Sequence, residues 1–202
     1  MRIMCIGDSI TYGSGLSDLS QRWSDLTAAR TGVLMENLGV SGDTTGGMLA
    51  RCQYQVFPQK PDALILLGGP NEIFFTLEYL PSCANIVSIV RQAQAFGIAV
   101  LVGIPLPFVA EEVPVREWNM EKYNSLLATL CEQYANWLRL YCRQINVPVV
   151  DFREAFYRKD DSINKELFLD GIHPNTKGHQ IMSDVLCTSL KNLGWAQKLA
   201  KL

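Results

Sequence analysis

The chain of 202 residues lacks the features that mark nucleic-acid-binding and membrane-spanning proteins. Its 18 lysines and arginines stand against 20 acidic residues, giving a net charge of -2 with no basic stripe. No uninterrupted apolar stretch approaches the ~20 residues that span a bilayer. The strand-like run at residues 2–6 is too short for the apolar part of a signal peptide. We therefore expect a cytoplasmic protein with no nucleic-acid partner and no stable membrane insertion.

Cysteine and histidine are too scattered or too few to predict a metal site. The cysteines are Cys5, Cys52, Cys83, Cys131, Cys142 and Cys187, and no two have the spacing of a zinc or redox motif. Several lie in apolar segments, so we expect buried free thiols in a reducing compartment rather than disulfides. The two histidines, His173 and His179, have no obvious third ligand, so we expect no bound metal.

Common phosphate-binding and hydrolase motifs are also missing. The segment 7–13 (GDSITYG) fits neither G-x-G-x-x-G nor G-x-x-x-x-G-K-[ST], which disfavours a phosphate-binding loop. It is also not the G-x-S-x-G turn of the α/β-hydrolases. A flavodoxin-like nucleotide or flavin binder is a weaker alternative, which predicts a yellow protein or a bound mononucleotide.

The chain does contain alternating strand and helix patterns, in a composition typical of folded proteins, with 48% hydrophobic and 19% charged residues. Short apolar runs predict strands over residues 2–7, 33–38, 63–67, 99–103 and 147–150, each covered on both faces. Helical patterns lie at residues 22–31, 45–54, 83–96, 120–145 and 175–190. This alternation predicts one domain over residues 1–202, with a parallel sheet between two layers of helices.

Chemically distinctive residues follow the predicted strands, at the sheet edge where such folds bind ligands. Ser9 follows the first strand, and Gly7 allows a sharp turn there because it has no Cβ. Gly42 follows the second strand in segment 37–45 (NLGVSGDTT), and a glycine N–H suits an oxyanion. Asn71 follows the third strand with an amide that donates without a change of charge. Taken singly, each segment also fits a turn or a helix cap.

The segment 170–175 (DGIHPN) places a carboxylate three residues before a histidine. Asp170 would reach one imidazole nitrogen of His173 across a tight turn and leave the other nitrogen for a serine. Pro174 would fix the exit into the last helix. His179 lies within that helix, where we expect a half-exposed or core-edge side chain.

The order of these segments, with serine first, glycine second, asparagine third and Asp-x-x-His last, resembles the SGNH hydrolase superfamily, also called the GDSL esterase/lipase family. The resemblance covers essentially the whole chain. It implies a flavodoxin-like, three-layer α/β/α fold with about five parallel strands, and a serine hydrolase that cleaves carboxylic esters without a cofactor. Ser9, Asp170 and His173 would be catalytic. The N–H groups of Ser9 and Gly42 and the side chain of Asn71 would form the oxyanion hole.

Two positions depart from the third segment of that family, which usually reads Gly-x-Asn-Asp. Pro70 occupies the x position and Glu72 replaces the final Asp. Asn71 is retained, but Pro70 lacks an N–H and restricts the residue before it, so the geometry of this segment stays open.

The resemblance implies a small-molecule ester as the substrate. A short-acyl ester, a lysophospholipid or a thioester fits the resemblance, and an acetylated sugar is the alternative. Asp8, Phe74 and Phe108 are candidate substrate-binding residues. The two phenylalanines would line an acyl pocket with the irregular segment 104–117 or, equally, form core beneath it. A catalytically silent binding module is disfavoured by the retained serine, aspartate and histidine.

Overall fold

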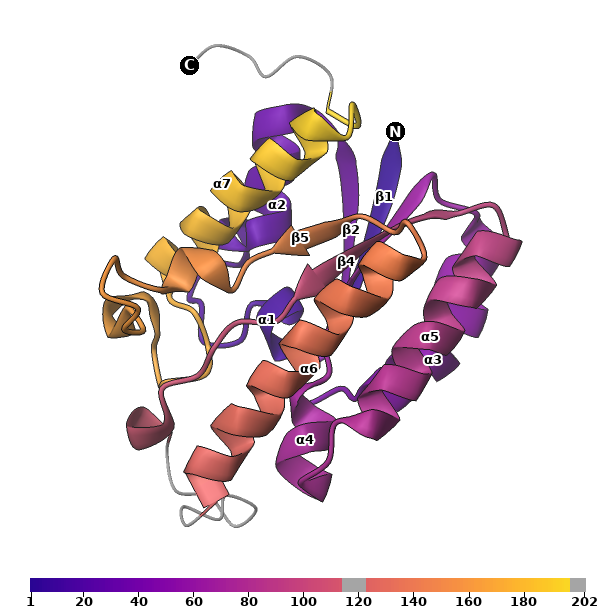
Figure 1. Cartoon of the computed structure of the whole chain (residues 1–202). Coiled ribbons are helices and arrows are strands. Elements are labelled where there is room, and N and C mark those ends of the chain that lie inside the picture. Colours follow the sequence, from indigo (N-terminus) through magenta and orange to yellow (C-terminus); the bar gives the residue numbers. More distant parts are fainter. Residues whose placement is uncertain (114–122, 197–202) are drawn as a thin grey trace.

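A five-stranded parallel sheet forms the centre of the computed structural model, which describes residues 1–113 and 123–196 (Figure 1). The strands are β1 (Arg2–Gly7), β2 (Leu34–Gly39), β3 (Ala63–Leu67), β4 (Ala99–Ile104) and β5 (Val149–Asp151). They lie in the order β2-β1-β3-β4-β5, and every neighbouring pair is parallel. The predicted α/β/α fold with five parallel strands is confirmed.

Helices cover both faces of the sheet, as Figure 1 shows. One layer contains α3 (Thr45–Arg51), α5 (Leu80–Ala95) and α6 (Asn124–Gln144), and the other contains α2 (Trp23–Thr31) and α7 (Thr176–Asn192). Two short helices, α1 (Ser9–Tyr12) and α4 (Pro70–Thr76), begin just beyond β1 and β3, and a π-helical turn (Cys52–Val56) continues α3. No helix within the described ranges is long and apolar enough to cross a bilayer.

Side chains of the central strands alternate between two cores, one on each face of the sheet. On β1, Ile3 and Cys5 pack with α2 and α7, whereas Met4 and Ile6 pack with α3 and α5. Successive side chains of a strand point to opposite faces, so a strand covered on both faces must be apolar throughout. β1 and β3 satisfy this condition and match their predicted bounds without a shift.

β2 does not meet the prediction that every strand is covered on both faces. Leu34 is 59% exposed and the remaining residues of β2 are only half-buried. The cause is its position, because β2 is the edge strand and pairs with β1 alone. The other edge strand, β5, is also only partly covered: Val149 and Asp151 are half-buried.

Three helices differ from the predictions. α4 was not among the predicted helices; Pro70 occupies its first turn, where a missing N–H costs nothing because that group has no helical partner. α5 begins at Leu80 rather than at residue 83. α6 ends at Gln144, one residue before its predicted end, and residues 120–122 of the prediction lie outside the described part of the chain.

The prediction that the cysteines are buried free thiols is confirmed. All six thiols are buried and none forms a disulfide. Burial raises the pKa of the thiols of Cys52, Cys83 and Cys131 to about 12, because the thiolate would lose its hydration. At neutral pH these groups are therefore protonated and unreactive.

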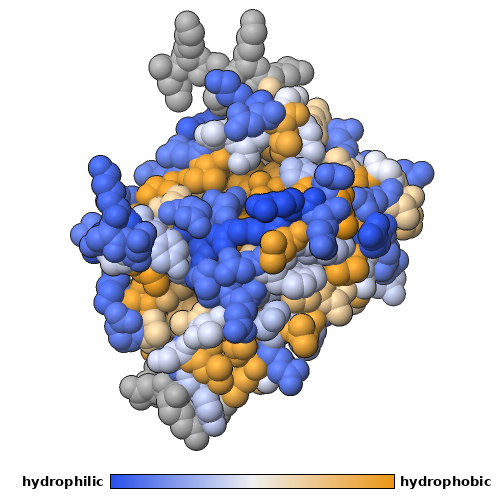
Figure 2. All heavy atoms as spheres, viewed as in Figure 1, coloured by the Kyte–Doolittle hydropathy of each residue, from blue (hydrophilic) through white to orange (hydrophobic). Residues whose placement is uncertain are grey.

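Charged side chains join α6 to the end of β5. Arg139 contacts Asp151 with 2.7 Å between Nε and Oδ2, and Arg153 forms an ion pair with Glu132. Strongly hydrophilic residues accordingly gather in the middle of the face that Figure 2 presents. These ion pairs lie at the β5 edge of the sheet and hold α6 against the segment that follows β5.

The strand register brings the ends of β1, β2 and β3 into one row. Gly7 is the register partner of Gly39 on one side and of Leu67 on the other. The chain passes from β1 outward to β2 and then returns to β3 on the opposite side of β1. Ligands of doubly wound sheets bind in the crevice at this reversal. We therefore expect the loops that follow β1, β2 and β3 to form the binding site.

Candidate active site

Ser9 is the first residue of α1, directly beyond the end of β1. The carboxylate of Asp8 caps this helix by accepting a hydrogen bond from the backbone N–H of Ile10 at 3.0 Å. The helix ends at Gly13, which has a φ of 87°. Gly7 is required for packing, because a Cβ there would lie 2.1 Å from Oγ1 of Thr11. These contacts hold the Ser9 hydroxyl at the carboxyl edge of the sheet, and only 7% of the residue is exposed.

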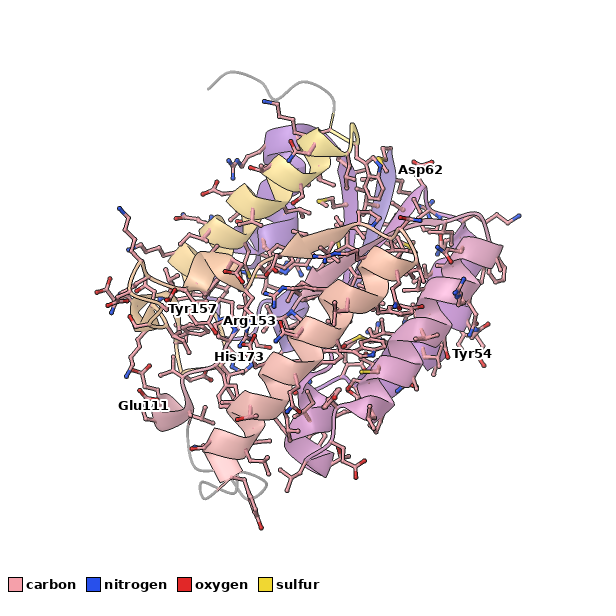
Figure 3. The ribbon with its side chains drawn as sticks, viewed as in Figure 1. Tyr54, Asp62, Glu111, Arg153, Tyr157 and His173 are labelled. Carbon is pink, nitrogen blue, oxygen red and sulfur yellow. The ribbon has the colours of Figure 1, made fainter. Side chains whose placement is uncertain are left out.

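Asp170 and His173 lie in a tight turn between β5 and α7. Figure 3 labels His173. One carboxylate oxygen of Asp170 accepts the backbone N–H groups of Ile172 at 3.1 Å and His173 at 2.8 Å. The other lies 2.8 Å from Nδ1 of His173. Burial raises the pKa of Asp170, but the hydrogen bonds from the His173 ring and backbone outweigh it and lower the pKa to about 2. The carboxylate is therefore ionised at neutral pH and can only accept hydrogen bonds.

The other ring nitrogen of His173 faces the serine. Nε2 lies 3.0 Å from Oγ of Ser9. Because the ionised Asp170 requires a hydrogen on Nδ1, a neutral imidazole carries its lone pair on Nε2. The serine hydroxyl can then donate to Nε2, which is the arrangement of a nucleophile beside its base.

A backbone hydrogen bond holds the turn with Asp170 and His173 against the segment that follows β4. The N–H of Val109, in the segment after β4, donates to the carbonyl of Gly171 at 2.8 Å. Gly171 has a φ of 79°, and a Cβ there would lie 2.7 Å from the carbonyl oxygen of Val109. This close approach and the left-handed backbone both require glycine.

A cavity of about 200 Å³ opens beside Ser9. It is lined by Ser9, Ser41, Gly42, Asn71, Phe74, Phe75, Ile172 and His173. Gly42 has a φ of 78°, which favours glycine. Asn71 donates one amide hydrogen to the carbonyl of Asp43 at 2.8 Å, so the amide has a second hydrogen for a ligand. The cavity therefore has a polar wall from Ser41, Gly42 and Asn71, and an apolar wall from Phe74, Phe75 and Ile172.

Two residues predicted at the substrate, Asp8 and Phe108, do not line this cavity. Asp8 is 4% exposed, and its carboxylate turns inward to cap α1; burial raises its pKa to about 6 despite the Ile10 N–H. Phe108 does not line the cavity, because its ring packs edge-on against Phe74 with 5.4 Å between the ring centres. Phe108 supports the cavity wall from behind and lines a separate hollow between α6 and the segment after β5.

The departures at Pro70 and Glu72 leave Asn71 in place. Gly69 has a φ of 122° and lies against the ring of Tyr134, so the chain turns sharply into α4. Glu72 is buried and accepts hydrogen bonds from the hydroxyl of Thr45 and from the N–H of Gly46 at 3.0 Å. The longer side chain of glutamate thus reaches the N-terminus of α3 and connects α4 to the loop that carries Gly42.

His179 is buried rather than half-exposed, which corrects the prediction for this residue. It is 0% exposed, and its Nδ1 accepts the backbone N–H of Trp23 at 3.2 Å. Burial, with the nearby charges of Arg22 and His173, lowers its pKa to about 4. It packs α7 against α2 as a neutral side chain. No group of three or more potential metal ligands among His, Cys, Asp and Glu occurs in the described residues.

The structure thus brings together five residues that the sequence predicted as one site: Ser9, Gly42, Asn71, Asp170 and His173. Sequence reasoning did not include Ile172 among the lining residues. Its position between Asp170 and His173 was the available signal, because a turn that delivers the imidazole also brings its neighbour to the cavity.

Comparisons with known proteins find a matching family, similar sequences and a similar fold. The sequence model of the GDSL-like lipase/acylhydrolase family matches residues 5–181. Esterase TesA from Pseudomonas aeruginosa is 32% identical over 111 residues, which cover 52% of this chain and 55% of that esterase, about half of its length. A lipoprotein of Bacillus subtilis, YqeF, is 24% identical over 89% of this chain and 85% of its own. The predicted cytoplasmic location therefore stays a prediction.

A solved structure shares the fold. It is a catalytic mutant of an acetylxylan esterase from Geobacillus stearothermophilus, with a TM-score of 0.75 and 20% identity. The match covers 98% of this chain and 96% of that one.

Proposed function

The chain belongs to the GDSL-like lipase/acylhydrolase family, and from that premise we propose that it hydrolyses carboxylic esters of short acyl groups, with Ser9 as nucleophile. One observation carries the proposal. Oγ of Ser9, the ring of His173 and the carboxylate of Asp170 form a continuous chain of contacts at 3.0 and 2.8 Å beside a cavity. The same contacts disfavour a catalytically silent binding module.

In the first half of the reaction, Oγ of Ser9 attacks the ester carbonyl carbon while its proton passes to Nε2 of His173. The carbonyl oxygen becomes an oxyanion, which the N–H groups of Ser9 and Gly42 and the Asn71 amide stabilise. Collapse of this intermediate breaks the bond to the alcohol, which leaves with the proton from Nε2. Asp170 remains ionised throughout and stabilises the imidazolium. Donors of this kind each contribute about 10²–10³ in kcat.

In the second half, water attacks the acyl group on Ser9. His173 takes one proton from the water and returns it to Oγ as the acyl–oxygen bond breaks. The carboxylic acid leaves, and the free serine is restored. Every proton is transferred through Nε2, so no metal or organic cofactor is needed for either half.

The size of the cavity favours short acyl groups. Pockets for drug-sized ligands usually measure about 300–1,000 Å³, whereas this cavity has about 200 Å³. Phe74, Phe75 and Ile172 form its apolar wall. We infer that the acyl chain lies against these side chains and that acetyl or butyryl esters fit better than octanoyl esters.

An acetylated sugar is the second candidate substrate. The polar wall continues outward through hydroxyl groups, because Oγ of Ser14 lies 3.1 Å from Oγ of Ser41 at the exposed rim. Hydroxyl groups at a rim suit a hydroxylated alcohol, and the structurally similar protein from Geobacillus stearothermophilus is an acetylxylan esterase. A lysophospholipid or a long-chain thioester would need a longer apolar channel beside Ser9.

Covalent labelling with a fluorophosphonate tests the proposal. Intact mass and peptide mapping of the wild type should show one adduct at Ser9, and Ser9→Ala should lose both the adduct and turnover. Rates with p-nitrophenyl acetate, butyrate and octanoate should fall with chain length. Ser41→Ala should keep the rate with p-nitrophenyl acetate and lose rate on acetylated xylo-oligosaccharides if the rim binds the sugar. A folded wild-type protein with no adduct and no turnover would refute the serine mechanism.

A further inference from the structure

Arg51, the last residue of α3, forms an ion pair with Asp43 behind the cavity. Nε and Nη2 of the guanidinium lie 3.0 and 2.6 Å from Oδ2 of Asp43. The two side chains are 19% and 10% exposed, and neither residue lines the cavity. An arginine that donates twice to one carboxylate fixes the relative orientation of the two groups.

The same guanidinium also bonds to the ends of two strands. Nη1 donates to the carbonyl of Leu38 in β2 at 2.9 Å, and Nη2 lies 3.4 Å from the carbonyl of Gly7 at the end of β1. The Gly7 carbonyl also accepts the N–H of Val40 at 3.0 Å. One side chain thus spans the point where the segment with Ser9 and the loop with Gly42 leave the sheet.

Asp43 is in turn connected to both proposed oxyanion donors beyond Ser9. It directly follows Gly42, and its N–H closes a turn by donating to the carbonyl of Val40 at 3.1 Å. Its own carbonyl accepts the amide of Asn71 at 2.8 Å. A shift of Asp43 would therefore move the Gly42 N–H and the Asn71 amide together.

We propose that Arg51 is a positioning residue, which orients Gly42 and Asn71 for the oxyanion by holding Asp43 against the ends of β1 and β2. This inference rests on the proposed function, because it requires an oxyanion at the cavity. Without the guanidinium, the carboxylate of Asp43 keeps only the N–H of Thr44, at 2.9 Å, and lies largely buried without a counter-charge. The turn at residues 40–43 would then relax toward solvent.

A loss of positioning should appear in kcat rather than in KM. The oxyanion exists in the transition state and not in the bound ester, so misplaced donors leave substrate binding almost unchanged. We expect Arg51→Met to lower kcat for p-nitrophenyl acetate by about 10- to 100-fold, less than the ~10²–10³ of a donor removed outright. KM should change less than about threefold.

Coupling between Arg51 and Asn71 separates positioning from a general structural role. Asn71→Ala alone should cost about 10²–10³ in kcat. In the Arg51→Met background the same change should cost less than about tenfold, because the amide is already displaced. Independent effects that multiply, or a folded Arg51→Met variant with wild-type kcat, would overturn the inference.

Arg139→Met is the matched control. Arg139 has a similar exposure, 23%, and forms a comparable ion pair with Asp151, but at the opposite edge of the sheet. It should lose stability and keep kcat. Arg51→Lys keeps the positive charge but lacks the several N–H donors of the guanidinium, so it should have an intermediate kcat. If Arg51→Met does not fold, Arg51→Lys replaces it in the coupling experiment with Asn71→Ala. A wild type without ester turnover, or active Ser9→Ala, would instead refute the proposed function and the inference with it.

Discussion

Replacing Asp170 by asparagine should remove most of the activity while leaving the fold intact. Oδ1 of Asp170 accepts the two backbone N–H groups of its turn, and an asparagine oxygen can accept the same bonds. Oδ2 faces Nδ1 of His173 at 2.8 Å, where the asparagine would instead present an NH₂ group. Two donors cannot face each other, so the imidazole hydrogen would move to Nε2. The ring would then donate to Ser9 and could no longer accept its proton.

The expected loss in kcat is about 10⁴-fold, as in serine hydrolases in which the corresponding carboxylate becomes an amide. At about 1.36 kcal/mol for each factor of ten, the loss corresponds to about 5 kcal/mol in the activation free energy. The pKa of Asp170, about 2, ensures that the wild-type carboxylate stays ionised in any assay near neutral pH. The comparison is therefore between a carboxylate and an amide, with no contribution from a protonated wild type.

The assay is steady-state hydrolysis of p-nitrophenyl acetate, with the thermal midpoint of each variant measured in parallel. Asp160→Asn is a suitable control, because Asp160 also accepts a backbone N–H in a turn, that of Ser162 at 3.1 Å, but does not contact the cavity. It should keep wild-type kcat. A loss below about tenfold in folded Asp170→Asn would refute the assignment of Asp170 as the residue that orients the base.

Three further changes test other parts of the structure. The pKa of His179 is about 4 in the folded protein, below its usual 6.5. Its contribution to the free energy of unfolding should therefore be complete above pH 6.5 and fall by up to about 3 kcal/mol as the pH drops to about 4; urea titrations should show a smaller loss in His179→Gln, and equal losses would contradict this. Gly7→Ala should lower the free energy of unfolding by about 1–3 kcal/mol, because its Cβ would lie 2.1 Å from a Thr11 oxygen; Gly46→Ala, whose Cβ meets no atom closer than 3.5 Å, should be tolerated in the same denaturation assay. Phe74→Ala should raise the octanoate-to-acetate ratio of kcat/KM at least about tenfold, since each methylene that is admitted contributes about 0.8 kcal/mol; an unchanged ratio would exclude Phe74 from the acyl wall.

The sheet could be predicted closely from the sequence because its signal is local. Central parallel strands are short and apolar on both faces, and β1 and β3 have this pattern without interruption. The bounds of β2 and β5 shifted by one or two residues, since strand ends depend on hydrogen bonds to neighbours that are distant in sequence. α4 was missed because Gly69 and Pro70 are typical of a turn, and the same two residues also begin a helix when the glycine takes a positive φ.

Long-range contacts explain what the site prediction lacked. The segment order placed Ser9 and His173 together although 164 residues separate them, because strand–helix alternation determines which loops share an edge. It could not show that the carboxylate of Asp8 turns inward to cap α1, because that depends on how the helix begins. Nor could it show that Glu72 reaches Thr45, since that contact joins two helices, α4 and α3, whose separation only the folded chain defines.

The site combines two parts that are held in different ways. Ser9, Gly42 and Asn71 lie just beyond the ends of β1, β2 and β3. These ends are aligned, because Gly7 pairs with Gly39 and with Leu67. Their relative positions follow from the sheet register and from the contacts of Asp43. His173 instead comes from a turn beyond β5 and reaches Ser9 across β4 and β3.

The histidine turn depends on the segment that follows β4. The 2.8 Å hydrogen bond from Val109 holds Gly171 against that segment, and no side chain larger than hydrogen fits between the two backbones. Phe108, next to Val109, packs on Phe74 in the cavity wall. The segment after β4 therefore contacts both the turn that carries His173 and the cavity wall, so a change in its conformation would alter the orientation of His173 and the shape of the cavity together.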